Sequence, residues 1–362
     1  MATKPTALTP IHEKLGAKMV DFGGFYMPLQ YTSIRAEHRR VRTTVGVFDV
    51  SHMGEFVFRG PDAEAFLDWT TVNNVRKLQM HQVQYSCACY PDAGIVDDLL
   101  VYRLPDYFLM VVNAANLEKD WAWFVEQKRG NCELENISDQ TSLLAVQGRS
   151  AATIVQKLTK SDLSAIQYYW CAEGEVAGVK TLISRTGYTG EDGFELMVKN
   201  EDAQKLWGAL FDAGKEFDIE PVGLGARDSL RLEMKYCLYG NDIDKTTNPL
   251  EAGLGWITKL QKGEFLGREP LLRAKEEGLK RKLIGFEIEG TGFPRPHYPI
   301  LSNGKQVGQV TSGTVSPMLE KGIGMGYVPT ELAEIGTPLE IDARGHILPA
   351  RIVKTPFYQR PY

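Results

Sequence analysis

An apolar stretch at residues 94–102 is interrupted by two adjacent carboxylates, Asp97 and Asp98. Its β-branched and aliphatic residues predict a buried strand. Because successive side chains of a strand point to opposite faces, the two aspartates are expected to face different surroundings. A buried carboxylate needs a hydrogen-bond donor, a cation or a polar ligand. One aspartate is therefore expected to face a site; a purely structural interpretation, with Asp97 capping backbone amides and Asp98 paired with an arginine, stays open.

The segments around this stretch alternate between the periods of strands and helices. Residues 55–60 alternate like a strand with one exposed face, and residues 91–94 have the composition of a turn. Together they predict a compact α+β unit between residues 51 and 136. Its predicted strands are 55–60, 84–90, 94–102 and 107–112, and its predicted helices are 61–69 and 117–126.

The pattern changes towards the C-terminus. A highly charged helix is predicted at residues 271–282, and short strands and turns follow it. Asn303 and Gly304 stand between two alternating runs, which is the strongest short signal for a β-hairpin. The sequence therefore predicts a small C-terminal β-barrel.

A second acid stands in an apolar strand pattern. Glu195 lies between Phe194 and Leu196, directly after a glycine-rich turn at residues 184–193. A carboxylate in such a place accepts hydrogen bonds from paired N–H donors, although a buried structural acid explains it equally well. Arg227 and Arg231 are four residues apart on a predicted helix and therefore share one face. They are expected either to face a pocket or to form ion pairs at the surface.

Composition narrows the class of protein. The chain has 362 residues, of which 43% are hydrophobic and 24% charged, and this balance is typical of a globular enzyme. The net charge is −5, so the composition shows no excess of basic residues that would favour binding to nucleic acid. No apolar run long enough for a membrane span or a signal core occurs, so we expect a cytoplasmic protein that does not bind membranes.

Candidate chemistry outside the two acidic strands is sparse. The five cysteines include a Cys87-x-Cys89 pair, but no second pair follows at metal spacing, so we expect reduced thiols and no metal. The strand–glycine–helix pattern at residues 143–151 lacks a phosphate-binding glycine motif. The lone His52 is expected to be a structural residue with satisfied nitrogens.

Six segments spread along the chain together resemble the aminomethyltransferase (T-protein) family of the glycine cleavage system. They are AKMVDF (17–22), FDVSHM (48–53), IVDD (95–98), RTGYTGE (185–191), GLGARD (223–228) and TSGTVSP (311–317). The resemblance implies a three-domain cloverleaf around a central folate cavity. Its domains would be a discontinuous folate-binding domain (1–50 and 137–275), an inserted α+β domain (51–136) and the C-terminal barrel (276–362).

The resemblance also implies roles for individual residues. Asp98 matches the catalytic aspartate that meets the reactive folate nitrogens, while Glu195 and Arg227 match the pair that holds the pterin end. Matches to positions that line the folate are Met53, Tyr85, Asn113 and Tyr188, and the tail would bring Tyr362 to the cavity mouth.

The activity implied is transfer of a methylene group from the S-aminomethyldihydrolipoyl arm of H-protein to tetrahydrofolate. Ammonia leaves and 5,10-methylenetetrahydrofolate forms. Asp98 would orient the folate and offset positive charge that develops on the transferred carbon. The implied co-substrate is tetrahydrofolate, no metal is required, and the implied partners are lipoylated H-protein and the other glycine cleavage components.

Two related functions are alternatives. Folate-dependent demethylases of small amines or sulfonium compounds share the implied fold, so fold alone does not decide between them. Non-enzymatic folate-binding proteins that maintain iron–sulfur clusters carry the motif K-G-C-Y-x-G-Q-E. Here the matching segment reads KGEFLGRE (262–269), with Glu264 in place of the cysteine, which argues against that role.

Overall fold

The chain folds into two compact units, and segments of the two units alternate along the sequence. A computed structural model describes residues 3–362. Unit 1 comprises the described residues up to Asp68, then Val75–Tyr85 and Leu99–Arg227; unit 2 comprises Trp69–Asn74, Ser86–Asp98 and Asp228–Tyr362. The chain passes from one unit to the other inside helix α3 (Ala63–Thr70), between residues 74 and 75, inside strands β6 (Val83–Cys89) and β7 (Ile95–Arg103), and inside helix α7 (Leu224–Glu233). The predicted division into three domains stays a prediction.

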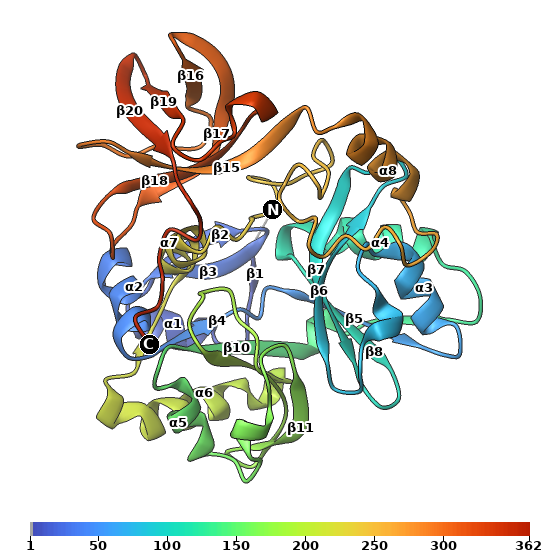
Figure 1. Ribbon diagram of the computed structural model, residues 1–362. Coiled ribbons are helices and arrows are strands. Elements are labelled where there is room, and N and C mark those ends of the chain that lie inside the picture. The colour runs from blue at the N-terminus through green and yellow to red at the C-terminus, as the bar shows by residue number, and fades with distance from the viewer. Residues whose placement is uncertain (1–2) are drawn as a thin grey trace. The chain divides into compact units, whose positions relative to one another are not determined.

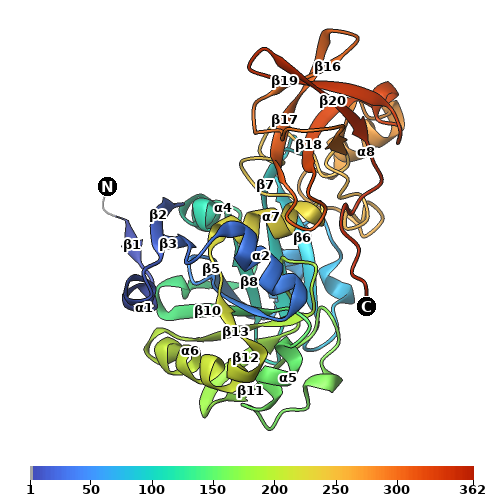
Figure 2. The same cartoon turned by 90° about the vertical axis from the view of Figure 1, so that its left-hand side faces the viewer.

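Unit 1 contains a mixed six-stranded sheet with helices α5 (Ala151–Gln156) and α6 (Asn200–Gly214) on one face (Figures 1 and 2). Buried residues of α6 recur at helical spacing at Ala203, Leu206 and Leu210, as expected for one apolar face. The strand order is β11 (Cys171–Val176), β12 (Val179–Ser184), β13 (Gly193–Lys199), β10 (Thr141–Gln147), β4 (Gly46–Asp49) and β14 (Glu220–Pro221).

Alternation along β13 sets the direction of Glu195. Phe194, Leu196 and Val198 are buried in the cluster that contains α5 and α6. Glu195 and Met197 therefore point to the opposite face of the sheet. Met197 packs there against a second cluster that includes Leu109 and Val57 of another sheet. Glu195 thus faces the space between two sheets.

The second sheet has five strands, and helices of unit 1 pack against it. Its order is β6, β7, β8 (Phe108–Val112), β5 (Gly54–Arg59) and β9 (Glu133–Asn136). Phe56 and Phe58 of β5 pack edge to face or tilted against rings of helices α3 (Ala63–Thr70) and α4 (Leu117–Glu126). The strands predicted at 84–90, 94–102 and 107–112 and the helix at 117–126 are confirmed.

One expectation for this sheet is wrong. Residues 55–60 were expected to expose one face, but every residue from Gly54 to Phe58 is buried. The reason is that the aromatic cluster covers one face of β5 and the apolar cluster of Val57, Leu109 and Met197 covers the other. The remaining elements of unit 1 are a small sheet in the order β1 (Lys4–Pro5), β3 (Phe25–Gln30), β2 (Lys18–Phe22), and helices α1 (Thr9–Lys14) and α2 (Ile34–Thr43).

Unit 2 contains a closed β-barrel, drawn in orange and red in Figure 1. Its order is β15 (Arg281–Ile288), β18 (Gly322–Pro329), β17 (Lys305–Val315), β16 (Pro299–Ser302), β19 (Pro338–Ala343) and β20 (His346–Ile352). Asn303 and Gly304, with φ of 51° and 72°, form the predicted hairpin turn. The α+β class and the C-terminal barrel are thereby confirmed.

The charged helix that precedes the barrel is shorter than expected. Helix α8 spans Arg268–Glu277 and stops at Gly278, whose φ of 86° ends the helix. Residues Arg281 and Lys282, expected to be helical, are the first of β15. No helix within residues 3–362 has the length and apolar character needed to cross a membrane.

A buried arginine joins three parts of unit 2. Arg231 on α7 is 1% exposed, and its guanidinium donates to Asp242 at 2.6 Å and to Ser312 of β17 at 2.7 Å. Asp242 also accepts hydrogen bonds from the hydroxyls of Ser312 and Thr311. The ion pair of Arg231 and Asp242 therefore connects the C-terminal half of α7 to the loop after it, and the contacts of both residues with Ser312 connect it to the barrel.

Candidate functional site

Glu195 is the acid at the centre of a buried polar cluster in unit 1. On the sheet it stands directly opposite Ser184 of β12. The Thr186 hydroxyl donates to the Glu195 carboxyl at 2.5 Å and lies 2.9 Å from the Ser184 hydroxyl. Burial raises the pKa of Glu195, while the Thr186 hydrogen bond and the positive charge of Arg227 act in the opposite direction. The neutral form of the Glu195 carboxyl is therefore more favoured than that of an ordinary surface glutamate.

Arg227 is the cation of the same cluster. It lies near the start of α7, and its guanidinium sits over the Tyr188 ring at 4.8 Å from the centroid. This geometry fits a cation–π contact. Burial lowers the pKa of Arg227, and the charge of Glu195 opposes that shift. The structure thus brings together three predicted site residues, Glu195, Arg227 and Tyr188.

Buried polar contacts fix the loop that carries Tyr188. Arg42 of α2 pairs with Glu191 at 2.8 Å, both side chains being fully enclosed, and it also donates to the Thr189 carbonyl. Gln147 at the end of β10 donates to the Thr186 carbonyl and accepts from the Thr189 hydroxyl. A glycine-rich turn is thereby fixed at both ends, as a binding loop on a rigid scaffold requires.

Met53 and His52 follow a second fixed turn. The carboxylate of Asp49, at the end of β4, accepts from the Ser51 amide at 2.9 Å, from His12 Nε2 at 2.9 Å and from the Thr6 hydroxyl. Met53 is half-buried and packs against the apolar cluster that also contains Met197. His52 is 2% exposed. Met53 therefore shares the space between the two sheets with the face of β13 that carries Glu195.

Three further predicted lining residues lie elsewhere on the described elements. Asn113 is half-buried immediately after β8, and its carbonyl accepts from the Asn116 amide. Tyr85 is half-buried on β6. Tyr362 is 53% exposed, with Arg360 over its ring at 6.0 Å. Contact of these three with a ligand stays a prediction.

Asp98 belongs to unit 2, on the part of β7 that carries the acidic pair. Asp97 is fully buried, whereas Asp98 is half-buried, so the two carboxylates lie in different environments, as alternation predicts. The thiols of Cys87 and Cys237 lie within electrostatic range of Asp98; burial, and then this charge among others, raises their pKa values. These thiols are therefore protonated and inert beside Asp98.

Sequence reasoning missed the residues that support Glu195. Thr186, Ser184 and Tyr102 surround it, and burial raises the pKa of Tyr102, with the charge of Glu195 adding to the effect. The alternation Ser184-x-Thr186 at the end of a strand was a usable local signal. Tyr102 was not detectable, because it comes from a strand more than eighty positions away along the chain.

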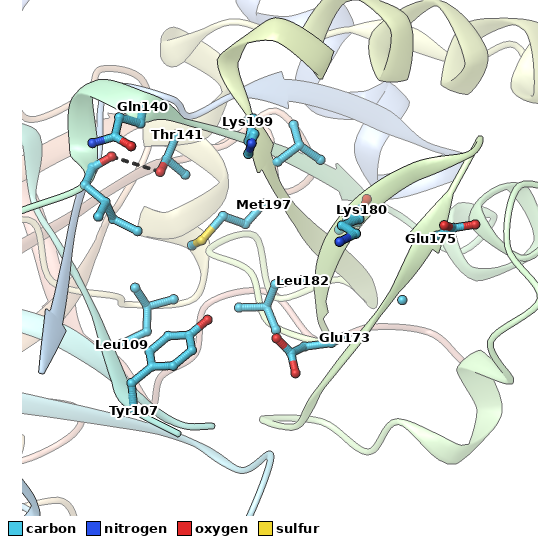
Figure 3. A pocket seen from close by; sticks show the side chains of 14 residues that line it. Tyr107, Leu109, Gln140, Thr141, Glu173, Glu175, Lys180, Leu182, Met197 and Lys199 are labelled. Atoms are coloured by element: carbon cyan, nitrogen blue, oxygen red, sulfur yellow. Dashed lines mark hydrogen bonds between the residues drawn. The ribbon is translucent and has the colours of Figure 1, made fainter. Parts of the chain in front are cut away.

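A separate cavity of about 640 Å³ opens in unit 1 (Figure 3). Tyr107, Leu182 and Met197 surround its apolar part, and Glu173, Lys180 and Lys199 contribute charged groups. None of the predicted site residues lines this cavity. It is therefore distinct from the cluster around Glu195.

Within residues 3–362, no group of three or more histidine, cysteine, aspartate or glutamate side chains is arranged to hold a metal ion. All five cysteines are buried free thiols.

Comparison with known proteins gives full-length matches. Residues 8–262 match the GCVT N-terminal domain, and residues 281–359 match the glycine cleavage T-protein C-terminal barrel domain. An aminomethyltransferase of Flavobacterium psychrophilum is 51% identical, covering 99% of this chain and 100% of that protein. An aminomethyltransferase of Bacteroides thetaiotaomicron is 54% identical, and the match covers 98% of this chain and 99% of that protein. The crystal structure of glycine cleavage system aminomethyltransferase T from Bartonella henselae matches with a TM-score of 0.93 at 33% sequence identity. The match covers 100% of this chain and 99% of that protein.

Proposed function

The chain belongs to the T-protein family of the glycine cleavage system, and on that premise we propose how its residues carry out the reaction. It is an aminomethyltransferase. We propose that it moves the methylene of an S-aminomethyldihydrolipoyl group, carried by H-protein, to tetrahydrofolate, with release of ammonia. The alternatives of a demethylase or a cluster-maintenance protein receive no support from relatives of this identity and coverage.

The cluster around Glu195 fits the ring end of a reduced folate. A pterin edge offers N–H donors beside a carbonyl acceptor, and a carboxyl next to a guanidinium presents the complementary acceptor and donors. Glu195 and Arg227 supply these two groups from β13 and α7, and Tyr188 offers a ring face beside them. This juxtaposition is the observation that carries the proposed folate site.

Asp98 is proposed as the catalytic residue. Tetrahydrofolate, as a substrate, supplies the nitrogen nucleophiles that accept the one-carbon unit. The Asp98 carboxylate would accept a hydrogen bond from the reacting end of the folate and offset positive charge developing on the carbon, which is a positioning and electrostatic role. The protonated thiols near Asp98 add no competing negative charge.

The partners and location complete the proposal. Lipoylated H-protein is the donor of the aminomethyl group, and the other glycine cleavage components supply and recycle it. The reaction is proposed to run in the cytoplasm, with no contribution from nucleic acid, membrane or metal.

The deciding experiment measures ammonia release and 5,10-methylenetetrahydrofolate formation from aminomethyl-loaded H-protein. Parallel reactions with and without added tetrahydrofolate test the acceptor. We expect product formation that depends strongly on folate. Turnover of free small amines or sulfonium compounds without a lipoyl carrier, in place of this reaction, would contradict the proposal.

Replacing Arg227 tests the pterin-binding pair. Arg227→Met is expected to raise the Kd for tetrahydrofolate about 10-fold or more, because a hydrogen bond to a charged group contributes about 1.5–3 kcal/mol. The measurement is equilibrium binding by calorimetry. The matched control is Arg59→Met, which removes an exposed arginine that pairs with Glu135 and is expected to leave the Kd unchanged. An unchanged Kd in Arg227→Met would remove this arginine from the site.

A further inference from the structure

His52 is a buried histidine with an unused polar atom. The side chain is 2% exposed, and Nδ1 has no hydrogen-bond partner among residues 3–362. Leaving a buried polar group unpaired costs about 1–3 kcal/mol. The sequence-based expectation of a satisfied structural histidine is therefore wrong for this nitrogen, and an orphaned polar atom inside a folded protein needs an explanation, such as an ordered water or a bound ligand.

The surroundings keep this imidazole neutral. Burial lowers the pKa of His52 to about 3, and the positive charge of Arg227 acts in the same direction, while Asp49 opposes them. Across the physiological range His52 therefore has one nitrogen that donates and one that accepts. A ring in this state forms hydrogen bonds with a neutral heterocycle without bringing a second positive charge next to Arg227.

The ring is also fixed in direction. Phe22 meets it edge to face with centroids 5.4 Å apart, and Phe25 meets it at 6.5 Å, both from the small sheet of unit 1. The backbone before it is held by the hydrogen bond from the Ser51 amide to Asp49. Asp49 is in turn paired with the fully enclosed His12. A side chain held by aromatic contacts and a fixed turn is preorganised for binding.

We propose that His52 is a ligand-binding residue of the folate site, whose Nδ1 forms a hydrogen bond with a polar atom of the bound reduced folate. This inference deepens the proposed function and rests on it. His52 directly precedes Met53, and it lies within electrostatic range of Arg227, which sits on Tyr188. The unpaired nitrogen and the pterin-binding pair therefore belong to one neighbourhood of unit 1.

The test uses three substitutions that separate the two ring nitrogens. The asparagine amide reaches the position of Nδ1, the glutamine amide reaches that of Nε2, and phenylalanine keeps the aromatic packing without either nitrogen. His52→Phe and His52→Gln are expected to raise the Kd for tetrahydrofolate about 10-fold. His52→Asn is expected to stay within about 3-fold of wild type, which a merely structural role for the ring would not produce.

A spectroscopic readout accompanies the binding measurements. In wild-type protein labelled with ¹⁵N-histidine, the Nδ1 resonance of His52 is expected to shift on addition of tetrahydrofolate, while the resonances of the exposed His346 stay in place. Wild-type affinity in His52→Phe, or an unshifted Nδ1 resonance at saturating folate, would overturn the inference and leave the proposed function intact. Failure of the wild-type protein to bind tetrahydrofolate at all would overturn both.

Discussion

Asp98→Asn is expected to lower turnover about 10²-fold while the Kd for tetrahydrofolate changes little. The substitution keeps the shape of the side chain and one acceptor oxygen, but it replaces the other oxygen by an NH2 donor and removes the negative charge. Electrostatic and acid–base contributions of single groups are of this size, and they act on the transition state rather than on substrate binding. The measurement is steady-state ammonia release from aminomethyl-loaded H-protein, with folate affinity determined separately.

A matched control removes a charge of the same kind from an exposed position. Asp106→Asn, in the turn before β8, is expected to leave both turnover and affinity at wild-type values. Near-normal turnover in Asp98→Asn would exclude Asp98 from the mechanism. Equal losses in turnover and affinity would reduce it to a ligand-positioning residue.

Arg231→Met is expected to lower the free energy of unfolding by about 3–5 kcal/mol. The methionine fills much of the arginine's volume but leaves the fully buried Asp242 carboxylate without its cation, and breaking one side of a buried pair has an effect of this size. Urea unfolding followed by circular dichroism measures the loss. Arg351→Met, which breaks an exposed pair with Glu289, is expected to change stability by no more than about 1 kcal/mol. A similar small loss in Arg231→Met would show that the remaining donors, the Ser312 and Thr311 hydroxyls and the Leu238 amide, satisfy Asp242.

The elements that could be predicted are those in which local pattern and tertiary environment agree. Alternation in the β7 stretch placed Asp97 and Asp98 in different surroundings, and the structure has one buried and one half-buried. The Asn303–Gly304 turn was predictable because its two positive φ angles depend only on those two residues. Glu195 stood out because an acid in an apolar strand is unusual at any position.

The features that could not be predicted depend on segments distant in the chain. Exposure of β5 depends on what covers each face, and both coverings come from elsewhere in unit 1. The partners of Glu191 and Asp49 are Arg42 and His12, at separations that no local period reveals. Whether His52 is satisfied likewise depends on which donors and acceptors the fold happens to bring to it.

Because segments of the two units alternate along the chain, no single cut separates one unit from the other. A fragment that ends before the barrel, near residue 280, retains Trp69–Asn74, Ser86–Asp98 and the part of unit 2 that begins at Asp228, but it lacks the barrel. The barrel alone lacks Arg231, and so its Ser312 and Thr311 hydroxyls lose the charge pair that they contact in the whole chain. Neither product of such a cut contains a whole unit 2. Complementation of separately expressed fragments, and limited proteolysis at the stretch after α8, are thus expected to report on the assembly of the complete polypeptide rather than on autonomous modules.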